Sequence, residues 1–192
     1  MQGIDEARAR DHLEMVDRIL AETQPRLCSG GEFFLVWGIA SALITVVAKL
    51  VRQGTLAPGW LWTVGVMLAA AAVFSIVRGR QTRRQLARTS LVQREFFNVL
   101  WLTLGLAFVV NVAVYNIFTG AASGAIWSVA EAIVLLYIGL HGNRRAQIAG
   151  VLVVVSLVVA NFGPANLTAY ILAAGMLAGY GGFGAAELLA RE

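Results

Sequence analysis

Long apolar runs alternate with short polar stretches along most of this chain. A helix rises about 1.5 Å per residue, so about 20 apolar residues cross a bilayer core of roughly 30 Å. The pattern predicts six transmembrane helices, at residues 33–51, 60–77, 96–118, 125–140, 146–162 and 167–189. The fourth and fifth runs are short, so they need a turn from their flanks or a thinner bilayer. The predicted fold class is all-α, with a polytopic membrane domain of three hairpins over residues 33–192.

Residues 1–32 differ from the rest because they are charged and their apolar positions form only a narrow stripe. Five charged residues alternate in sign at i, i+4 spacing, which stabilises an isolated helix: Glu6, Arg10, Glu14, Arg18 and Glu22. We therefore predict a cytoplasmic amphipathic helix at residues 4–24, followed by a linker to the first span. The apolar stripe includes three candidate partner-docking residues, Leu13, Val16 and Leu20. The chain's own loops, another protein or lipid headgroups could cover this stripe.

Basic residues are concentrated between the second and third apolar runs. Residues 78–94 contain six arginines and no acid: Arg78, Arg80, Arg83, Arg84, Arg88 and Arg94. A second basic loop, at residues 141–145, lies two predicted spans later, whereas the alternate loops carry a single charge, at Arg52. Loops rich in Lys and Arg stay on the cytoplasmic side. The pattern therefore predicts a bacterial inner-membrane protein with both termini in the cytoplasm.

Composition supports the membrane assignment. Hydrophobic residues make up 58% of the chain and charged residues 14%, with a mean hydropathy of +0.72, which exceeds what a soluble core requires. The net charge of +4 lies mainly in the loops, as topology determinants do, so we expect no nucleic-acid binding. The single cysteine, Cys28, excludes an internal disulfide or a thiolate cluster. The first 32 residues lack the apolar segment of a cleavable signal peptide.

Glu131 is the one acid well inside a predicted span, and an ionisable residue at such depth is a candidate functional site. Counting from the outer ends of the spans places Asn111 at a similar depth on the preceding helix, with Lys49 near the same end. Three roles are open for Glu131. It joins helices by hydrogen bonding to Asn111 or Lys49, it holds a proton or cation facing a cavity, or it contacts another subunit.

The last span contains small residues at four-residue spacing, with Gly175 before Gly179 and Ala178 before Gly182. Such GxxxG-type spacing allows helix backbones to approach closely in lipid. We expect Gly175, Gly179 and Gly182 to form a helix-packing face. The helix against this face belongs either to the same chain or to another protein.

No constellation of residues indicates catalysis or a cofactor. A haem held within the membrane needs paired ligands, whereas His12 lies on the N-terminal helix and His141 at the cytoplasmic end of the fourth span. Nucleophile–base patterns, phosphate-binding loops and metal-ligand spacings are absent from the sequence. We therefore expect no enzymatic activity and no bound metal or cofactor.

The N-terminal pattern resembles that of other bacterial proteins. A charged helix ends at Pro25, and Gly30, Gly31 and Glu32 precede a span that contains Trp37. This arrangement looks like uncharacterised bacterial multi-span membrane proteins with a short cytoplasmic helix before the membrane, over about the first 40 residues. The resemblance implies no particular activity. The ratio of fourteen arginines to one lysine also fits a GC-rich bacterial genome.

These observations favour a non-catalytic role. We expect an accessory or structural subunit of a larger membrane complex, such as a respiratory or photosynthetic one, because no chemistry is indicated and the N-terminal apolar stripe needs cover. The alternative is a small transporter or channel for protons, ions or a small solute that uses Glu131. A third class is a membrane-anchored regulatory or sensor protein that works through residues 1–32. The expected partners are the lipid bilayer and other membrane subunits.

Overall fold

The computed structural model describes residues 14–15, 30–85, 91–113 and 121–190. Every regular element in these ranges is a helix, so the predicted all-α fold class is confirmed. Most of the predicted N-terminal helix, including Leu13, Val16 and Leu20, lies outside the described residues. Glu14 and Met15 are helical and exposed.

The helices coincide with the apolar runs of the sequence. In chain order they are α2 (Gly31–Arg52), the 3-10 turn η1 (Pro58–Trp60), α3 (Leu61–Gln85), α4 (Leu91–Ala113), α5 (Ala121–Leu140), α6 (Arg144–Phe162), α7 (Thr168–Met176), the π-helical segment η2 (Leu177–Gly181) and α8 (Gly182–Leu189). The last three follow one another without a break and form the helix expected at residues 167–189.

Four helices in the described ranges are long and apolar enough to cross a membrane: Gly31–Arg52, Pro58–Gln81, Arg144–Phe162 and Thr168–Leu189. Two shorter apolar stretches lie at Asn98–Asn111 and Gly124–Leu140. By helix length and composition, the chain is a membrane protein. The fifth predicted span begins two residues earlier than its apolar run because Asn143 caps it, accepting a hydrogen bond from the backbone N–H of Ala146 at 3.0 Å.

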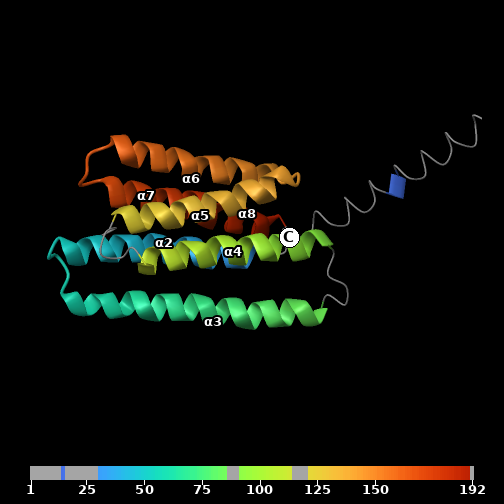
Figure 1. The fold of residues 1–192 in the computed structure, drawn as a ribbon, viewed down its shortest axis with the longest axis horizontal. Coiled ribbons are helices and arrows are strands. Elements are labelled where there is room, and N and C mark those ends of the chain that lie inside the picture. The colour runs from blue at the N-terminus through green and yellow to red at the C-terminus, as the bar shows by residue number, and fades with distance from the viewer. Residues whose placement is uncertain (1–13, 16–29, 86–90, 114–120, 191–192) are drawn as a thin grey trace, which may run out of the picture.

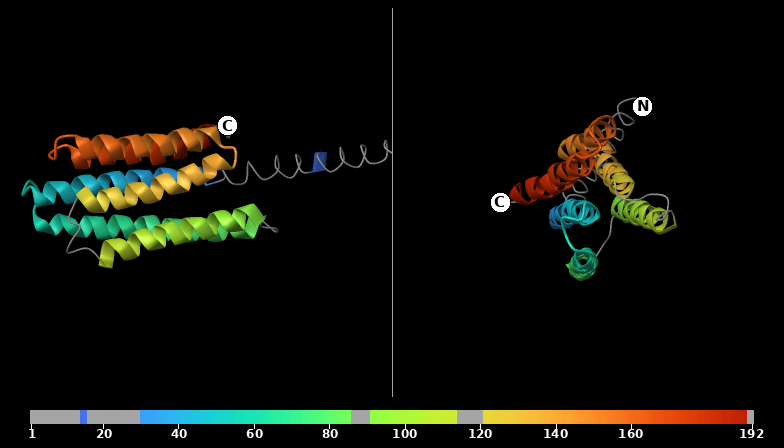
Figure 2. Two further views of the ribbon diagram at one scale, coloured as in Figure 1. Left: turned by 45° about the horizontal axis from the view of Figure 1, so that its top comes forward. Right: turned by 90° about the vertical axis from the view of Figure 1, so that its left-hand side faces the viewer.

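A compact bundle forms the centre of the molecule, and two further helices lie at its edge (Figures 1 and 2). The bundle consists of α2, α5, α6 and the continuous segment from α7 to α8. Among the described residues, α3 packs mainly on α2 and α4 mainly on α5, so each outer helix is attached along one side. The bundle core contains large side chains that are almost fully buried: Val134, Leu135, Ile138, Val153, Leu172 and Met176.

Charged residues bring several helix ends together at one end of the bundle. Glu32 at the start of α2 forms an ion pair with Arg78 of α3 at 2.5 Å. Arg145 at the start of α6 lies 3.9 Å from Glu187 near the end of α8. Gly31 lies beside Glu187, which connects the two ion pairs in space. The ends of α2, α3, α6 and α8 that the sequence assigns to the cytoplasm therefore lie on the same side.

Candidate functional site

Glu131 is buried inside the bundle, on the face of α5 that meets α2. Its relative exposure is 3%. Its Oε1 lies 2.7 Å from Oγ of Ser41 in α2, whereas Oε2 is buried with no hydrogen-bond partner. An unpartnered carboxyl oxygen is costly at such depth, since neither water nor lipid replaces the missing bond. Among the described residues, the carboxyl group of Glu131 therefore has one hydrogen-bond partner, the hydroxyl group of Ser41.

The predicted partners of Glu131 make other contacts. The side-chain amide of Asn111 donates a hydrogen bond to a backbone carbonyl of its own helix, four residues earlier, at 2.9 Å. The ammonium group of Lys49 lies 5.3 Å from the centre of the Tyr170 ring, as a cation–π contact. Counting residues along two helices shows that two side chains lie at the same depth in the membrane. It does not show in which direction each side chain points around its helix axis. The structure accordingly pairs Glu131 with Ser41 in place of Asn111 or Lys49.

Ser41 approaches two acceptors, although its hydroxyl group has one hydrogen. Its Oγ lies 2.7 Å from Glu131 Oε1 and 2.7 Å from the backbone carbonyl oxygen of Trp37. When Glu131 is ionised, the hydroxyl can donate to only one of these oxygens. When Glu131 carries a proton, it donates to Ser41 and Ser41 donates to Trp37, so that both contacts are hydrogen bonds. The arrangement can therefore hold a proton within the bundle.

The same residues connect three helices. Trp37 Nε1 donates to Oγ of Ser75 in α3 at 2.9 Å, and Ser75 donates to the Ala71 carbonyl at 2.8 Å. A series of polar contacts thus runs from α5 through α2 to α3. Sequence analysis missed it because the partners are distant in sequence, 90 positions apart for Ser41 and Glu131 and 38 for Trp37 and Ser75. Single serines in apolar helices give no signal of their own.

The polar groups of this region are suited to joining helices or holding a proton. Other hydroxyl groups on α2 and α5 donate to their own backbones, Thr45 to the Ser41 carbonyl at 2.8 Å and Ser128 to the Gly124 carbonyl at 3.0 Å. Within the described ranges, no group of three or more His, Cys, Asp or Glu could hold a metal ion.

Two of the three predicted packing glycines contact a neighbouring helix of the same chain. A Cβ added at Gly175 would overlap Ser156 of α6, and one added at Gly179 would overlap Val153. These glycines let the last span approach α6 closely, as small residues do in lipid. Gly182 differs, because it is exposed and its added Cβ would meet only a carbonyl oxygen of its own segment, at 3.9 Å.

The π-helical segment η2 explains why Gly182 lies off the packing face. A π-helical turn contains more residues than an α-helical one, so the residues after it are rotated around the helix axis. Gly181 and Gly184 lie against α2 instead. A Cβ added at Gly38 would overlap the backbone of Gly181, and one added at Gly184 would crowd the carbonyl oxygen of Gly31. The seven-residue spacing of Gly31 and Gly38 in the first span was the available sequence signal for this contact.

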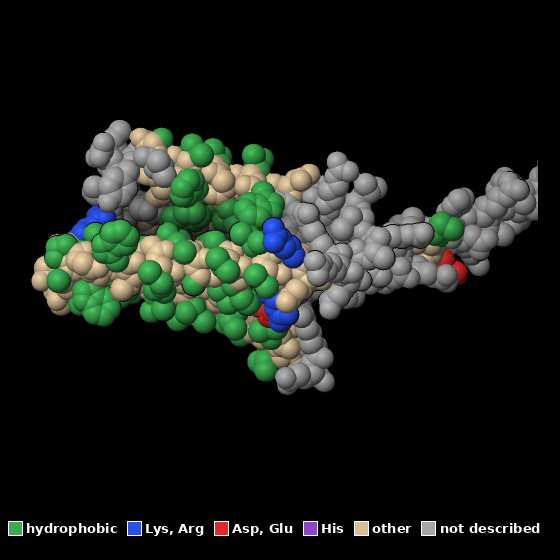
Figure 3. Space-filling model, turned by 90° about the horizontal axis from the view of Figure 1, so that it is seen from below, with side chains coloured by type: hydrophobic (Ala, Val, Ile, Leu, Met, Phe, Trp, Pro, Cys, Tyr) green, Lys and Arg blue, Asp and Glu red, His purple; other side chains and the backbone are tan. Residues whose placement is uncertain are grey.

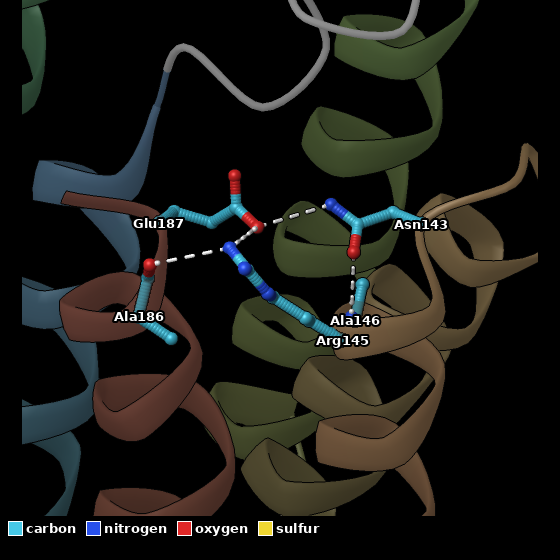
Figure 4. A network of polar contacts seen from close by, with 5 residues as sticks. All are labelled: Asn143, Arg145, Ala146, Ala186 and Glu187. Atoms are coloured by element: carbon cyan, nitrogen blue, oxygen red, sulfur yellow. Dashed lines mark hydrogen bonds and ion pairs between the residues drawn. The ribbon is translucent and has the colours of Figure 1, made fainter. Parts of the chain in front are cut away.

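A polar network joins α6 and α8 at the charged end of the bundle (Figure 4). The side-chain amide of Asn143 donates to Glu187 Oε1 at 3.3 Å, while its carbonyl oxygen caps α6. Arg145 Nη1 lies 3.9 Å from the same carboxylate oxygen and 3.5 Å from the Ala186 carbonyl oxygen. The described contacts give Glu187 a structural role between two helices.

Comparisons with known proteins give no match: no family model fits the chain, and no curated protein or solved structure matches it. The resemblance of the first 40 residues to uncharacterised bacterial membrane proteins therefore stays a prediction. Function must be inferred from contacts, burial and charge.

Proposed function

We propose that this chain is a non-catalytic accessory or structural subunit of a larger complex in the bacterial inner membrane. The outer helices carry the proposal. Among the described residues, α3 and α4 each have their main contacts with one helix of the bundle, α2 and α5 respectively. A helix attached along one side has room for a second neighbour, and a larger assembly supplies such neighbours within the membrane.

The distribution of glycines supports this proposal. Inside the bundle, Gly38 and Gly175 lie where two helices approach too closely for a Cβ. In the outer helices, a Cβ added at Gly65 or Gly105 would meet no described residue within 4 Å. A glycine in a helix interior is less favourable than alanine by about 1 kcal/mol, so an unpacked glycine needs a separate reason. Close approach of a partner helix is such a reason.

The outward surface of α4 has the shape that a partner helix could use. Large exposed side chains lie on both sides of Gly105 in the sequence: Trp101, Leu102, Leu106 and Phe108. A small residue among bulky ones leaves a hollow for a side chain of the facing helix. Aromatic residues are also enriched where proteins meet one another. α4 is therefore the surface that we assign to the main partner.

We further propose six spans, with both termini in the cytoplasm. α4 has 23 residues and α5 has 20, and about 20 residues at roughly 1.5 Å each are enough to cross the bilayer core. The ion pairs of Glu32 with Arg78 and of Arg145 with Glu187 lie at the end of the bundle from which the arginine-rich loop leaves. Retention of basic loops in the cytoplasm supports this orientation.

Purification from native membranes tests the proposed function. The full chain is isolated in a mild detergent, and stoichiometric companions are identified by native electrophoresis and mass spectrometry. Gly105→Phe is the informative variant, because nothing in the described chain lies within 4 Å of the added Cβ. Gly105→Ala, which adds a single methyl group, is the milder step of the same series.

We expect companions with the wild-type chain and a smaller amount of them with Gly105→Ala. With Gly105→Phe, the companions should be lost while the thermal stability of the chain itself is retained. A wild-type chain that purifies alone, as a monomer or a homo-oligomer, contradicts the proposal.

Transport of protons or ions through Glu131 is the second candidate function. The buried Oε2 without a hydrogen-bond partner favours it, because such an atom is available to a transient proton or cation. The test is pH-driven flux into liposomes that contain the wild-type chain, Glu131→Gln or the control Glu187→Gln. Loss of flux with Glu131→Gln alone supports transport, and absence of flux with the wild type rejects it. A regulatory role of residues 1–32 stays a prediction, because most of that segment lies outside the described residues.

A further inference from the structure

A shallow groove, wide open on its outer side, runs along α3, and the residues described in its lining all belong to this helix. Its lining changes in character along the helix. From Val66 through Ala70 and Phe74 to Val77 the lining is apolar, and at Arg78 and Gln81 it is polar. We propose that this groove binds an anionic phospholipid of the cytoplasmic leaflet, with an acyl chain along the apolar part and the phosphate group at Arg78.

The dimensions of the groove fit this ligand. Val66 and Val77 are eleven residue steps apart. At a rise of roughly 1.5 Å per residue, these steps correspond to about 16 Å of helix. One leaflet of the hydrocarbon core is about 15 Å thick, half of roughly 30 Å. An acyl chain from one leaflet can therefore occupy the apolar part along its full length.

The polar end of the groove presents a positioned cation. Arg78 Nη2 contacts the Glu32 carboxylate at 2.5 Å, and Arg78 Nη1 donates to Gln81 Oε1 at 3.3 Å. The Arg78 side chain nevertheless remains 44% exposed, so part of the guanidinium group is open to a ligand. Guanidinium groups bind phosphate through several N–H donors at once. Arg80, Arg83 and Arg84 follow in the sequence and add positive charge beyond the single charge of Glu32.

The order of the chemistry along α3 favours a lipid over a protein helix. Figure 3 shows the side of the molecule that includes α3, with hydrophobic side chains over most of the surface and Lys or Arg side chains near the two ends of the bundle. Within α3 itself, the basic residues begin at Arg78. A protein helix in this groove would need an acidic residue beside Arg78. It would also need an uninterrupted apolar face from that residue to the middle of the bilayer. A phospholipid has an anionic group above an apolar chain by its own structure. Basic sites beside transmembrane helices bind anionic headgroups for this reason.

Native mass spectrometry of the full chain in detergent tests the proposal. The probes are phosphatidylglycerol and phosphatidylcholine with identical acyl chains. We expect phosphatidylglycerol to bind at least tenfold more tightly. Arg78→Gln should weaken phosphatidylglycerol binding at least fivefold, whereas Arg52→Gln, at the other end of the bundle, should leave it unchanged. Ala70→Phe should block binding of both lipids, whereas Ala72→Phe, on the same helix but outside the described lining, should not.

Glu32→Gln separates lipid binding from a purely structural role of Arg78. Removing the carboxylate leaves the guanidinium group unpaired, so we expect phosphatidylglycerol to bind several-fold more tightly. If Arg78 serves only to attach α3 to α2, both Glu32→Gln and Arg78→Gln will lower thermal stability without altering lipid selectivity. That result would overturn the proposal, as would equal binding of the two lipids by the wild-type chain.

A photo-crosslinking residue at position 70 identifies the occupant of the groove in native membranes. Crosslinks to phospholipid are expected. Crosslinks to another protein, or to a second copy of this chain, would contradict the proposal. The partner proposed for α4 is tested at Gly105 on a different helix, so the two proposals fail independently.

Discussion

Ser41 Oγ and Glu131 Oε1 lie 2.7 Å apart across the contact between α2 and α5. Because Ser41 also lies 2.7 Å from the Trp37 carbonyl oxygen, the protonation state of Glu131 decides how many of these contacts are hydrogen bonds. The Trp37 indole continues the connection to Ser75 of α3. A single buried carboxyl group is therefore linked to the attachment of an outer helix.

Glu131→Gln should fold almost as stably as the wild type, because its amide can donate to Ser41 as a protonated carboxyl group does. Glu131→Ala leaves a cavity and removes the partner of Ser41, so we expect a loss of about 2 kcal/mol or more. Unfolding of the chain in mixed micelles measures both changes. Equal destabilisation by the two substitutions would show that the interaction requires an ionised carboxylate.

A double-mutant cycle measures the Ser41–Glu131 contact directly. Ser41→Ala, Glu131→Leu and the double variant are compared by their free energies of unfolding in micelles. We expect a coupling energy of about 0.6 kcal/mol, with an upper bound of roughly 1.7 kcal/mol, as for other hydrogen bonds between transmembrane helices. Additive effects of the two substitutions would mean that the contact contributes nothing to stability.

Alanine substitutions of glycine should have opposite effects in the two parts of the molecule. At Gly38 or Gly184 the added methyl group meets the backbone of the facing helix, so overpacking should cost about 1 to 3 kcal/mol. At Gly65 or Gly105 it meets nothing within 4 Å in the described part of the chain, and better helix propensity should raise stability by up to about 1 kcal/mol. Thermal unfolding of the four variants provides the comparison. Unchanged stability of the Gly38 and Gly184 variants would contradict the close contact of α2 with the last span.

The Glu32–Arg78 ion pair should contribute little to stability. Both side chains are partly exposed, at 33% for Glu32 and 44% for Arg78, so water and salt screen their attraction. We expect Glu32→Gln to lower the free energy of unfolding by less than about 1 kcal/mol, and the difference to shrink as the salt concentration rises. A larger loss that persists at high salt would indicate that the pair is buried in the assembled protein.

Cysteine labelling tests the proposed orientation. In a Cys28→Ser background, Thr55→Cys lies at one end of the bundle and Arg144→Cys at the other, and both positions are exposed. In intact cells, a membrane-impermeant maleimide should label position 55 and should label position 144 only after the cells are opened. The reverse pattern would place the arginine-rich loop outside the cytoplasm and reject the proposed topology.

The sequence by itself determined the class of the protein and the positions of its helices. Backbone polar groups in an apolar environment must bond within their own segment, so an apolar run of about 20 residues leaves a helix as the stable choice. The order of apolar runs and basic loops therefore predicted where each described helix lies, although α3 continues eight residues past its apolar run, to Gln85, and α4 begins five residues before its own, at Leu91. GxxxG spacing also identified Gly175 and Gly179 as packing positions. Small residues four positions apart form a flat strip on one side of a helix, and this can be recognised from the local sequence alone.

Only the tertiary structure decided which faces of the helices meet. Depth along a helix can be counted from the sequence, but direction around its axis depends on how neighbouring helices pack. For this reason, the contact of Glu131 with Ser41 could not be counted from the sequence, nor could the bond of Asn111 to its own helix or the position of Lys49 over Tyr170. The π-helical segment before Gly182 changes that direction within a single helix, which places Gly184 and not Gly182 against α2. The rotation of each helix about its own axis is set by contacts between residues that are far apart in the sequence. A local sequence pattern therefore does not reveal it.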